Sequence, residues 1–218
     1  MTPRFSPVLF DLDGTIVDSA PGILASLAWT YEQLRMPVPP PAELLRWVGP
    51  PILDSFRDLA KLDEDESRYA LALYREHYRA EGVFDAPAYP GVLEALRAIH
   101  AAGVPLSLAT SKPESLARMI LENLGVAGAF TEITGASEDE VRSSKPDVVA
   151  EALRRLATDG DTGPAPVMVG DRIYDVEGAA EHGVPTIFVT WGYGSPAEAA
   201  GAIATTDTTA ELLAVLGL

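Results

Sequence analysis

From residue 84 onward, short apolar runs of strand length alternate with amphipathic segments of helix length, and no other feature restricts the fold as much. This alternation is typical of a mostly parallel β-sheet that is covered by helices on both faces. The polar stretch at 158–166 is expected to be a loop. The sequence predicts a doubly wound α/β fold, with strands at 7–12, 104–110, 130–135, 165–171 and 184–190.

The stretch between the first two predicted strands has a different character, because residues 18–83 show helical periodicity almost throughout. Apolar residues recur at helical spacing from Ile23 to Leu34, and the run Pro37–Pro41 then ends that helix. Three further helices are expected before residue 84. We therefore predict an α/β core of residues 1–17 and 84–218, with a helical-bundle domain of residues 18–83 inserted into it.

The composition excludes several classes of function. The formal net charge is −16, so a phosphate backbone would be repelled and no nucleic-acid partner is expected. The chain has no cysteine, which excludes disulfides, thiolate metal sites and cysteine nucleophiles. It has no apolar window of about 20 residues, and acids interrupt its first apolar run too early for a signal peptide. We expect a cytoplasmic protein, monomeric or homodimeric, that makes no membrane contact.

Charged and hydroxyl side chains follow several of the predicted strands. Asp11 and Asp13 come directly after the first apolar run, in the stretch FDLDGTIVDS, and Thr110, Ser111 and Lys112 end the second strand. Ligands of an open parallel sheet bind beyond the carboxyl ends of its strands, so these side chains are expected at one edge. Later segments bring three more charged groups to that edge, namely Lys145, Asp171 and Asp175.

These residue types suit phosphoryl transfer. A carboxylate can attack phosphorus and form an aspartyl-phosphate, while a second carboxylate protonates the leaving alkoxide and later activates water. Asp11 and Asp13 are two residues apart, so they lie on the same side of a continuing strand. Further carboxylates can hold Mg²⁺, which prefers oxygen ligands and bridges to phosphate. The turn at Gly14 and Thr15 can offer backbone N–H groups to a phosphate.

Four motifs occur in the order DLDGTIVDS, ATSKP, SSKP and VGDRIYDVEGA, and together they resemble those of the haloacid dehalogenase superfamily. The resemblance covers nearly the whole chain. It implies that Asp11 is the nucleophile, that Asp13 is the general acid and base, and that Thr110 and Lys145 act on the phosphoryl group. The implied Mg²⁺ ligands are Asp11, Asp13, Asp171 and Asp175, and the implied phosphate- or substrate-binding residues are Gly14, Thr15, Ser111, Lys112, Gly49 and Pro50.

Looser motifs resemble two subgroups of this superfamily, the phosphoglycolate phosphatase-like members and a bacterial 5′-nucleotidase-like group beside them. These motifs are WVGPPILDSF in the helical insertion, GDRIYDVEGA, and WGYGS at Trp191–Ser195. The insertion itself resembles the cap domain of the family, which closes over the site and selects the substrate. The resemblance therefore places Gly49 and Pro50 in a loop that determines substrate specificity.

The predicted function is a Mg²⁺-dependent phosphomonoester phosphatase that acts through an aspartyl-phosphate on a small ester such as 2-phosphoglycolate. A 5′-nucleotidase that hydrolyses nucleoside monophosphates is the alternative. A β-phosphoglucomutase-type phosphotransferase is a further alternative, but VDSAPGILASLAW lacks the basic and histidine pattern that such mutases usually carry after the first motif. A purely binding role would predict decay of the motif residues, and all of them are intact.

Overall fold

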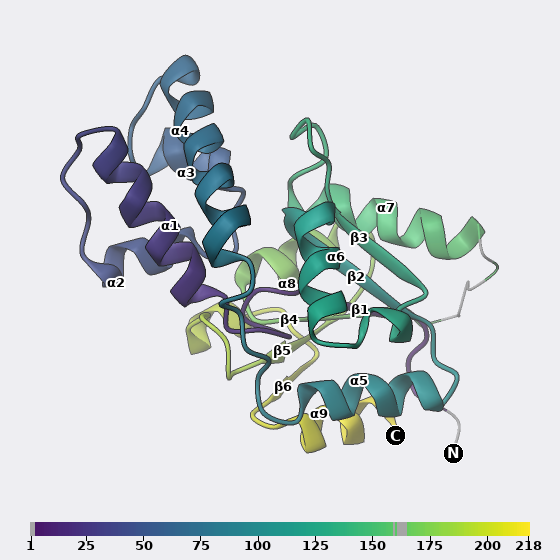
Figure 1. Ribbon diagram of the computed structural model, residues 1–218. Coiled ribbons are helices and arrows are strands. Elements are labelled where there is room, and N and C mark those ends of the chain that lie inside the picture. Colours follow the sequence, from purple (N-terminus) through teal and green to yellow (C-terminus); the bar gives the residue numbers. More distant parts are fainter. Residues whose placement is uncertain (1–2, 159, 161–164) are drawn as a thin grey trace.

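The computed structural model describes residues 3–158, 160 and 165–218, so the loop expected at 158–166 lies largely outside the described residues (Figure 1). Six strands form one sheet in the order β3-β2-β1-β4-β5-β6, and every neighbouring pair is parallel. The predicted α/β fold is confirmed. The strands are β1 (Val8–Phe10), β2 (Leu106–Pro113), β3 (Glu132–Ala136), β4 (Val167–Gly170), β5 (Thr186–Val189) and β6 (Ala204–Thr206).

Helices cover both faces of the sheet because the central strands are apolar on both sides. Val8 and Phe10 of β1 belong to one buried cluster, whereas Leu9, which points to the opposite face, belongs to another. The first cluster includes residues of α5, α6 and α9, and the second includes residues of α7 and α8 (Figure 1). These helices are α5 (Val92–Ala101), α6 (Glu114–Asn123), α7 (Lys145–Thr158), α8 (Ile173–Ala180) and α9 (Thr209–Leu216).

The chain between β1 and α5 forms a separate group of helices beside the sheet (Figure 1). Trp47 lies at the centre of this group, where its ring meets Phe56 and Tyr31 edge to face at centroid distances of 5.0 and 6.0 Å. The division of the chain at residues 18 and 83 stays a prediction. The elements of the group are α1 (Ala20–Gln33), α2 (Pro41–Leu44), the 3₁₀-helix η1 (Leu45–Trp47), α3 (Ile52–Asp58), α4 (Glu64–His77) and the π-helical turn η2 (Tyr78–Gly82).

The two chain segments that join the helical group to the sheet meet at its base. Val17 forms an isolated bridge with Ala88, so the outgoing and returning segments are paired there. Gly22 and Gly82 touch through their backbones, since a Cβ atom built on Gly22 would lie 2.2 Å from the carbonyl oxygen of Gly82. Only glycine allows this approach, which brings α1 and the π-helical turn η2 together where the helical group joins the sheet.

Two features of the sheet differ from the sequence-based expectation. Strand β6 was not predicted, because its three residues at the edge of the sheet are too few to show a periodicity. Strand β2 continues past Thr110 to Pro113, with an irregular register between Ala109 and Pro113. This extension carries Ser111 and Lys112 beyond the body of the sheet, toward the helical group.

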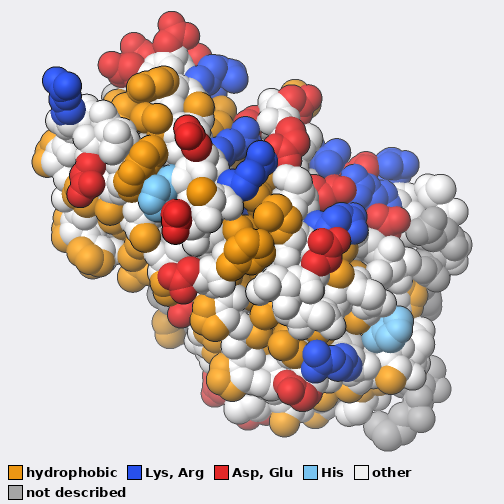
Figure 2. All heavy atoms as spheres, viewed as in Figure 1, with side chains coloured by type: hydrophobic (Ala, Val, Ile, Leu, Met, Phe, Trp, Pro, Cys, Tyr) orange, Lys and Arg blue, Asp and Glu red, His pale blue; other side chains and the backbone are white. Residues whose placement is uncertain are grey.

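On the face drawn in Figure 2, acidic and basic side chains are interspersed, and the basic ones form no continuous patch there. In the described part of the chain, none of the helices combines the length and the apolar character that are required to cross a bilayer.

Candidate active site

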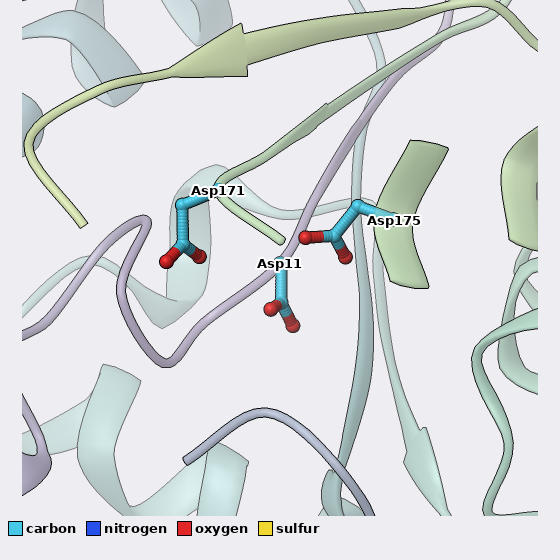
Figure 3. Close-up of side chains that lie close together, drawn as sticks. All are labelled: Asp11, Asp171 and Asp175. Carbon is cyan, nitrogen blue, oxygen red and sulfur yellow. The ribbon is translucent and has the colours of Figure 1, made fainter. Parts of the chain in front are cut away.

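Three aspartates from two strand ends and one helix converge at the carboxyl edge of the sheet. Asp11 follows β1, Asp171 follows β4, and Asp175 lies in the first turn of α8. Their carboxylates face a common space (Figure 3), and one oxygen of each lies within 4.8 Å of the others. All three residues are buried, with exposed fractions of 3% for Asp11 and 0% for the other two. The sequence predicted this convergence correctly.

Lys145 supplies the positive charge beside this cluster. Its Nζ lies 2.8 Å from Oδ1 of Asp11 and 2.8 Å from Oδ1 of Asp175, and it donates a hydrogen bond of 3.0 Å to the carbonyl of Ala109. Lys145 is the first residue of α7, so its side chain reaches the strand ends from the helix start. Gly178 of α8 leaves room for its stem, because a Cβ atom there would lie 2.8 Å from Cγ of Lys145.

Asp171 is held by two hydrogen bonds, one to each oxygen of its carboxylate. The hydroxyl of Thr15 donates to its Oδ1 at 3.1 Å, and the backbone N–H of Tyr193 donates to its Oδ2 at 2.7 Å. Gly14 and Gly192 pack against the same carboxylate, since a Cβ atom on either would lie 2.3 Å from Oδ2. The orientation of Asp171 is therefore fixed by the turn after β1 and by the loop after β5.

Burial and mutual repulsion disfavour the state in which all three aspartates of the cluster are ionised. Burial raises the pKa of Asp11 to about 6, although Lys145 partly opposes the shift. Burial, with Asp175 and Asp11 as further causes, raises the pKa of Asp171 well above its usual range. Burial alone would lower the pKa of Lys145, but the two adjacent carboxylates outweigh it and raise that pKa. The cluster thus contains three carboxylates and one ammonium group, which pairs with two of them. The excess negative charge favours binding of a cation.

The donors at this site fit a divalent hard cation. Oδ1 of Asp11 and Oδ1 of Asp175 are buried and accept no hydrogen bond from the described residues, although Lys145 lies at ion-pair distance. Buried carboxylate oxygens of this kind are stabilised by a metal ion. An all-oxygen set with excess negative charge suits Mg²⁺. Asp11, Asp171 and Asp175 are the residues that would hold it.

Asp13 has a different environment from the three clustered aspartates. Its carboxylate is paired with Lys112, whose Nζ donates to Oδ1 at 2.8 Å and to Oδ2 at 3.0 Å. The structure therefore brings together three of the four predicted metal-ligating side chains. The fourth, that of Asp13, is paired with the ammonium group of Lys112 instead. A metal-ligating role for Asp13 stays a prediction.

The remaining predicted residues lie around the aspartate cluster and around the pair of Asp13 and Lys112. Thr110 is buried at the end of the regular part of β2, and its hydroxyl accepts a hydrogen bond of 3.3 Å from the N–H of Lys112. Gly14 has a left-handed φ of 87°, and Thr15 is fully buried next to Asp171. A pocket beside Asp13 is lined by the last four predicted residues, Ser111, Lys112, Gly49 and Pro50.

Several residues near the site were not predicted as functional from the sequence. Tyr193 binds Asp171 through its backbone, and its hydroxyl donates to Oδ1 of Asp18 at 2.7 Å. Trp191 donates from Nε1 to the carbonyl of Thr15 at 3.0 Å. The alternation of glycine and aromatic residues in WGYGS is the only sequence signal for this loop, and a backbone contact leaves no residue-type signature.

The comparison with known proteins is consistent with this geometry. A family model described as haloacid dehalogenase-like hydrolase matches residues 8–189, which includes the three clustered aspartates, Asp13 and Lys145. The chain belongs to this family. A solved structure of a predicted phosphatase from Clostridium acetobutylicum has the same fold, with a TM-score of 0.91 and 36% identity, and the match covers 98% of this chain and 99% of that one. The resemblance inferred from the four motifs is confirmed.

Three curated relatives carry different names. Tyrosine-protein kinase PtkA of Mycobacterium tuberculosis is 42% identical over 198 residues, and the match spans 88% of this chain but only 65% of PtkA. A 5′-nucleotidase of Pseudomonas aeruginosa is 34% identical over 89% of this chain and 87% of its own length. A phosphoglycolate phosphatase of Agrobacterium fabrum is 36% identical over 88% of this chain and 84% of its own. The two subgroups expected from the looser motifs are both present among the relatives.

Proposed function

We propose that this hydrolase is a Mg²⁺-dependent phosphomonoester phosphatase that forms an aspartyl-phosphate on Asp11. The observation that carries the proposal is the contrast between two aspartates that are two residues apart. Asp11 lies in the carboxylate cluster beside Lys145, whereas Asp13 lies outside the cluster and has Lys112 as its own partner. Two carboxylates in different environments can take two different chemical roles.

In the first step, an oxygen of Asp11 attacks phosphorus and the bond between phosphorus and the alcohol oxygen breaks. Asp13 gives its proton to the leaving alkoxide. Lys145 orients Asp11 and neutralises charge on the phosphoryl group, and the hydroxyl of Thr110 binds one of its oxygens. The N–H groups of Gly14 and Thr15 do not take the phosphate-binding role expected from the sequence. They donate to the carbonyls of Val17 and Leu12 at 2.9 and 3.3 Å and so hold the turn after β1. Bound Mg²⁺ would supply further neutralisation of the phosphoryl charge, held by the clustered aspartates.

In the second step, Asp13 takes a proton from water, and the water oxygen attacks phosphorus. The bond between phosphorus and Asp11 breaks, which releases inorganic phosphate and restores both carboxyl groups to their starting states. One ester and one water thus give one alcohol and one phosphate. We propose that the helical group of residues 18–83 acts as a cap that excludes bulk water during the first step.

The preferred substrate in this proposal is a small ester such as 2-phosphoglycolate. The pocket beside Asp13 is enclosed by the helical group, with Trp47, Gly49 and Pro50 on one side and Ser111 and Lys112 on the other. Enclosure of this kind favours a small leaving group. The relative named 5′-nucleotidase supports nucleoside monophosphates as the alternative substrates. The relative named tyrosine-protein kinase PtkA suggests a further alternative, in which the phosphoryl group is transferred to a tyrosine hydroxyl and not to water.

Phosphate release from a panel of esters tests the proposal. The panel contains 2-phosphoglycolate, nucleoside monophosphates and hexose phosphates, each measured with Mg²⁺ and with a chelator. We expect release that requires Mg²⁺ and falls by about 10³-fold or more in Asp11→Asn and in Asp13→Asn. Asp58→Asn, which changes an exposed aspartate on α3, is the matched control and should retain full activity.

Each other outcome leads to a different function. Absence of release from every ester, with a folded protein that binds Mg²⁺, would contradict hydrolysis. Isomerisation of a hexose phosphate without net release would indicate a mutase. Labelling of a tyrosine substrate from a phosphoryl donor, lost in Asp11→Asn, would indicate transfer to protein, as the name of PtkA suggests.

A further inference from the structure

Tyr193 lies in the loop after β5, and its two ends contact two different parts of the molecule. Its backbone N–H donates to Oδ2 of Asp171 at 2.7 Å. Its hydroxyl donates to Oδ1 of Asp18 at 2.7 Å and accepts a hydrogen bond of 2.9 Å from the N–H of Ala20, the first residue of α1. The catalytic steps use neither contact of the hydroxyl. One residue thus connects a carboxylate of the candidate metal site with the start of the helical group.

The loop that carries Tyr193 is held against Asp171 at more than one point. Trp191 donates from Nε1 to the carbonyl of Thr15, and the hydroxyl of Thr15 donates to the other oxygen of the Asp171 carboxylate. Burial raises the pKa of Asp171, and the N–H of Tyr193 acts against this rise because it favours the ionised carboxylate. A displacement of the loop would therefore disturb Asp171 in the form that a metal ion requires.

The other end of Tyr193 contacts the segment that leads from the sheet into the helical group. Within this segment, the N–H of Asp18 donates to the carbonyl of Pro87 at 2.9 Å, so the outgoing and returning segments are paired at this level. We call residues 17–20 and 87–89 the hinge. These two segments are the covalent links between the helical group and the sheet (Figure 1), so any movement of the group relative to the sheet must bend them.

The first turn of α1 depends on side chains of the hinge and of the loop after β5. Ser19, the residue before the helix, makes no side-chain capping bond. The N–H of Ala20 is instead bound by the hydroxyl of Tyr193 and, at 3.3 Å, by Oδ1 of Asp18, so these two side chains take the place of an N-cap. Burial raises the pKa of Tyr89 to about 12, and a side-chain hydrogen bond with Tyr193 partly opposes this rise. Tyr193 therefore contacts both segments of the hinge.

The side chain of Tyr193 can transmit a displacement from one end to the other. A tyrosine side chain turns about two bonds only, so a hydroxyl that is held in place restricts the backbone of the same residue. A metal ion that fixes Asp171 acts on this backbone through the N–H. If both ends are satisfied in one arrangement of the hinge, metal binding favours that arrangement, and by linkage the arrangement favours metal binding to the same extent.

We propose that Tyr193 is a positioning residue that couples occupation of the metal site to the order of the hinge. With the cation bound, Asp171 holds the N–H of Tyr193, and the hydroxyl of Tyr193 holds Asp18 and Ala20 in their observed positions. Without this hydroxyl the cation would still bind, but the hinge would not respond to it. This inference rests on the metal site and the cap proposed above, and it adds a connection between them that the two catalytic steps do not require.

Hydrogen exchange of the Ala20 amide, followed by NMR with and without Mg²⁺, tests this coupling. We expect saturating Mg²⁺ to slow the exchange by about 10-fold in the wild type and by less than about twofold in Tyr193→Phe. The Kd for Mg²⁺, measured by isothermal titration, should change by less than about threefold in this variant, because the N–H that binds Asp171 remains. Asp18→Ala should lose the response to Mg²⁺ as well, whereas Asp18→Asn keeps an acceptor and should retain part of it. Tyr69→Phe, a change of an exposed tyrosine on α4, is the matched control.

The outcomes separate this inference from a structural role and from the proposed function. If the hydroxyl only stabilises the helix start, Tyr193→Phe exchanges the Ala20 amide faster but keeps the wild-type response to Mg²⁺, and the coupling is overturned. A wild type that binds Mg²⁺ without any change at the hinge overturns it as well. A loss of Mg²⁺ affinity of more than about 10-fold in Tyr193→Phe would also overturn it, since the hydroxyl would then serve Asp171 itself. Absence of Mg²⁺ binding to the wild type would instead contradict the metal site, on which both the proposed function and this inference depend.

Discussion

Single glycines determine whether the carboxylates of the candidate metal site can occupy their positions. A Cβ atom on Gly192 would lie 2.3 Å from Oδ2 of Asp171 and 2.3 Å from the carbonyl oxygen of Gly14. On Gly170 it would lie 2.3 Å from Cγ of Asp175. The neighbours in question are the functional side chains and the backbone that holds them, so a methyl group cannot be accommodated without moving the site.

We predict that Gly192→Ala weakens Mg²⁺ binding by about 10-fold or more, because it displaces the carboxylate of Asp171. Stability should fall by about 1–3 kcal/mol as well, as for other cases of overpacking. Isothermal titration with Mg²⁺ and thermal unfolding measure the two effects. The matched control is Gly128→Ala, where a Cβ atom would have no neighbour within 4 Å. Unchanged Mg²⁺ affinity in Gly192→Ala would contradict the proposed role of Asp171.

Residues of the site could be predicted from the sequence where their role depends on the type of side chain. Asp11 and Asp171 directly follow apolar strand segments, where a charged group is informative, whereas Lys145 was predictable only from its place in the SSKP motif. Tyr193 was not predictable as a functional residue, because it holds Asp171 through its backbone N–H.

At the scale of secondary structure, the start of α8 is tied to the helical group. Arg172 directly precedes α8, and its guanidinium donates to the carbonyl of Val48, which lies between η1 and α3. Nε of the same side chain donates to Oε2 of Glu198 at 2.9 Å, which fixes its direction. The loop that carries Asp171 is thus linked to the segment that begins the predicted specificity loop at Gly49. This link favours a closed arrangement of the two parts.

We predict that Arg172→Met loosens this closed arrangement. For 2-phosphoglycolate, KM should rise and kcat should fall, giving a loss in kcat/KM of about 10- to 100-fold, because closure contributes to both binding and chemistry. Mg²⁺ affinity should change by less than about threefold, since Arg172 is not a ligand. Arg154→Met removes an exposed arginine that pairs within α7 and is the control. Unchanged kinetics in Arg172→Met would mean that the contact with Val48 has no part in closure.

The order and type of the longer elements were predictable because periodicity extends over many residues. The last of the three further helices expected before residue 84 is observed as α4, which begins with a reciprocal capping box between Asp63 and Glu66. Its continuation as the π-helical turn η2 was not predictable, because the helical periodicity of the sequence does not distinguish a π-helical turn from a further turn of α-helix. Strand β6 escaped prediction because it is stabilised by pairing with β5 and not by its own sequence.

At the scale of the whole molecule, the acidic site couples stability to pH and to metal. The pKa of Asp11 is raised from 3.8 to about 6 by burial, so between these pH values the folded chain keeps a proton that the unfolded chain has lost. The free energy of unfolding of the metal-free protein should therefore decrease as the pH rises through this window. The raised pKa of Asp171 has the same sign and extends the effect to higher pH.

Binding of Mg²⁺ should reverse this loss of stability, because the cation requires the deprotonated carboxylates. We predict that saturating Mg²⁺ raises Tm by about 5–10 °C at pH 7.5 and by much less at pH 5. Thermal unfolding at the two pH values, with and without Mg²⁺, measures this difference. In Asp171→Asn the metal-free protein should be more stable at pH 7.5 than the wild type and the effect of Mg²⁺ should be small, whereas Asp58→Asn should behave as the wild type. An equal effect of Mg²⁺ at both pH values would show that the ion binds elsewhere on this acidic surface, because protons would then not compete with it at the buried cluster.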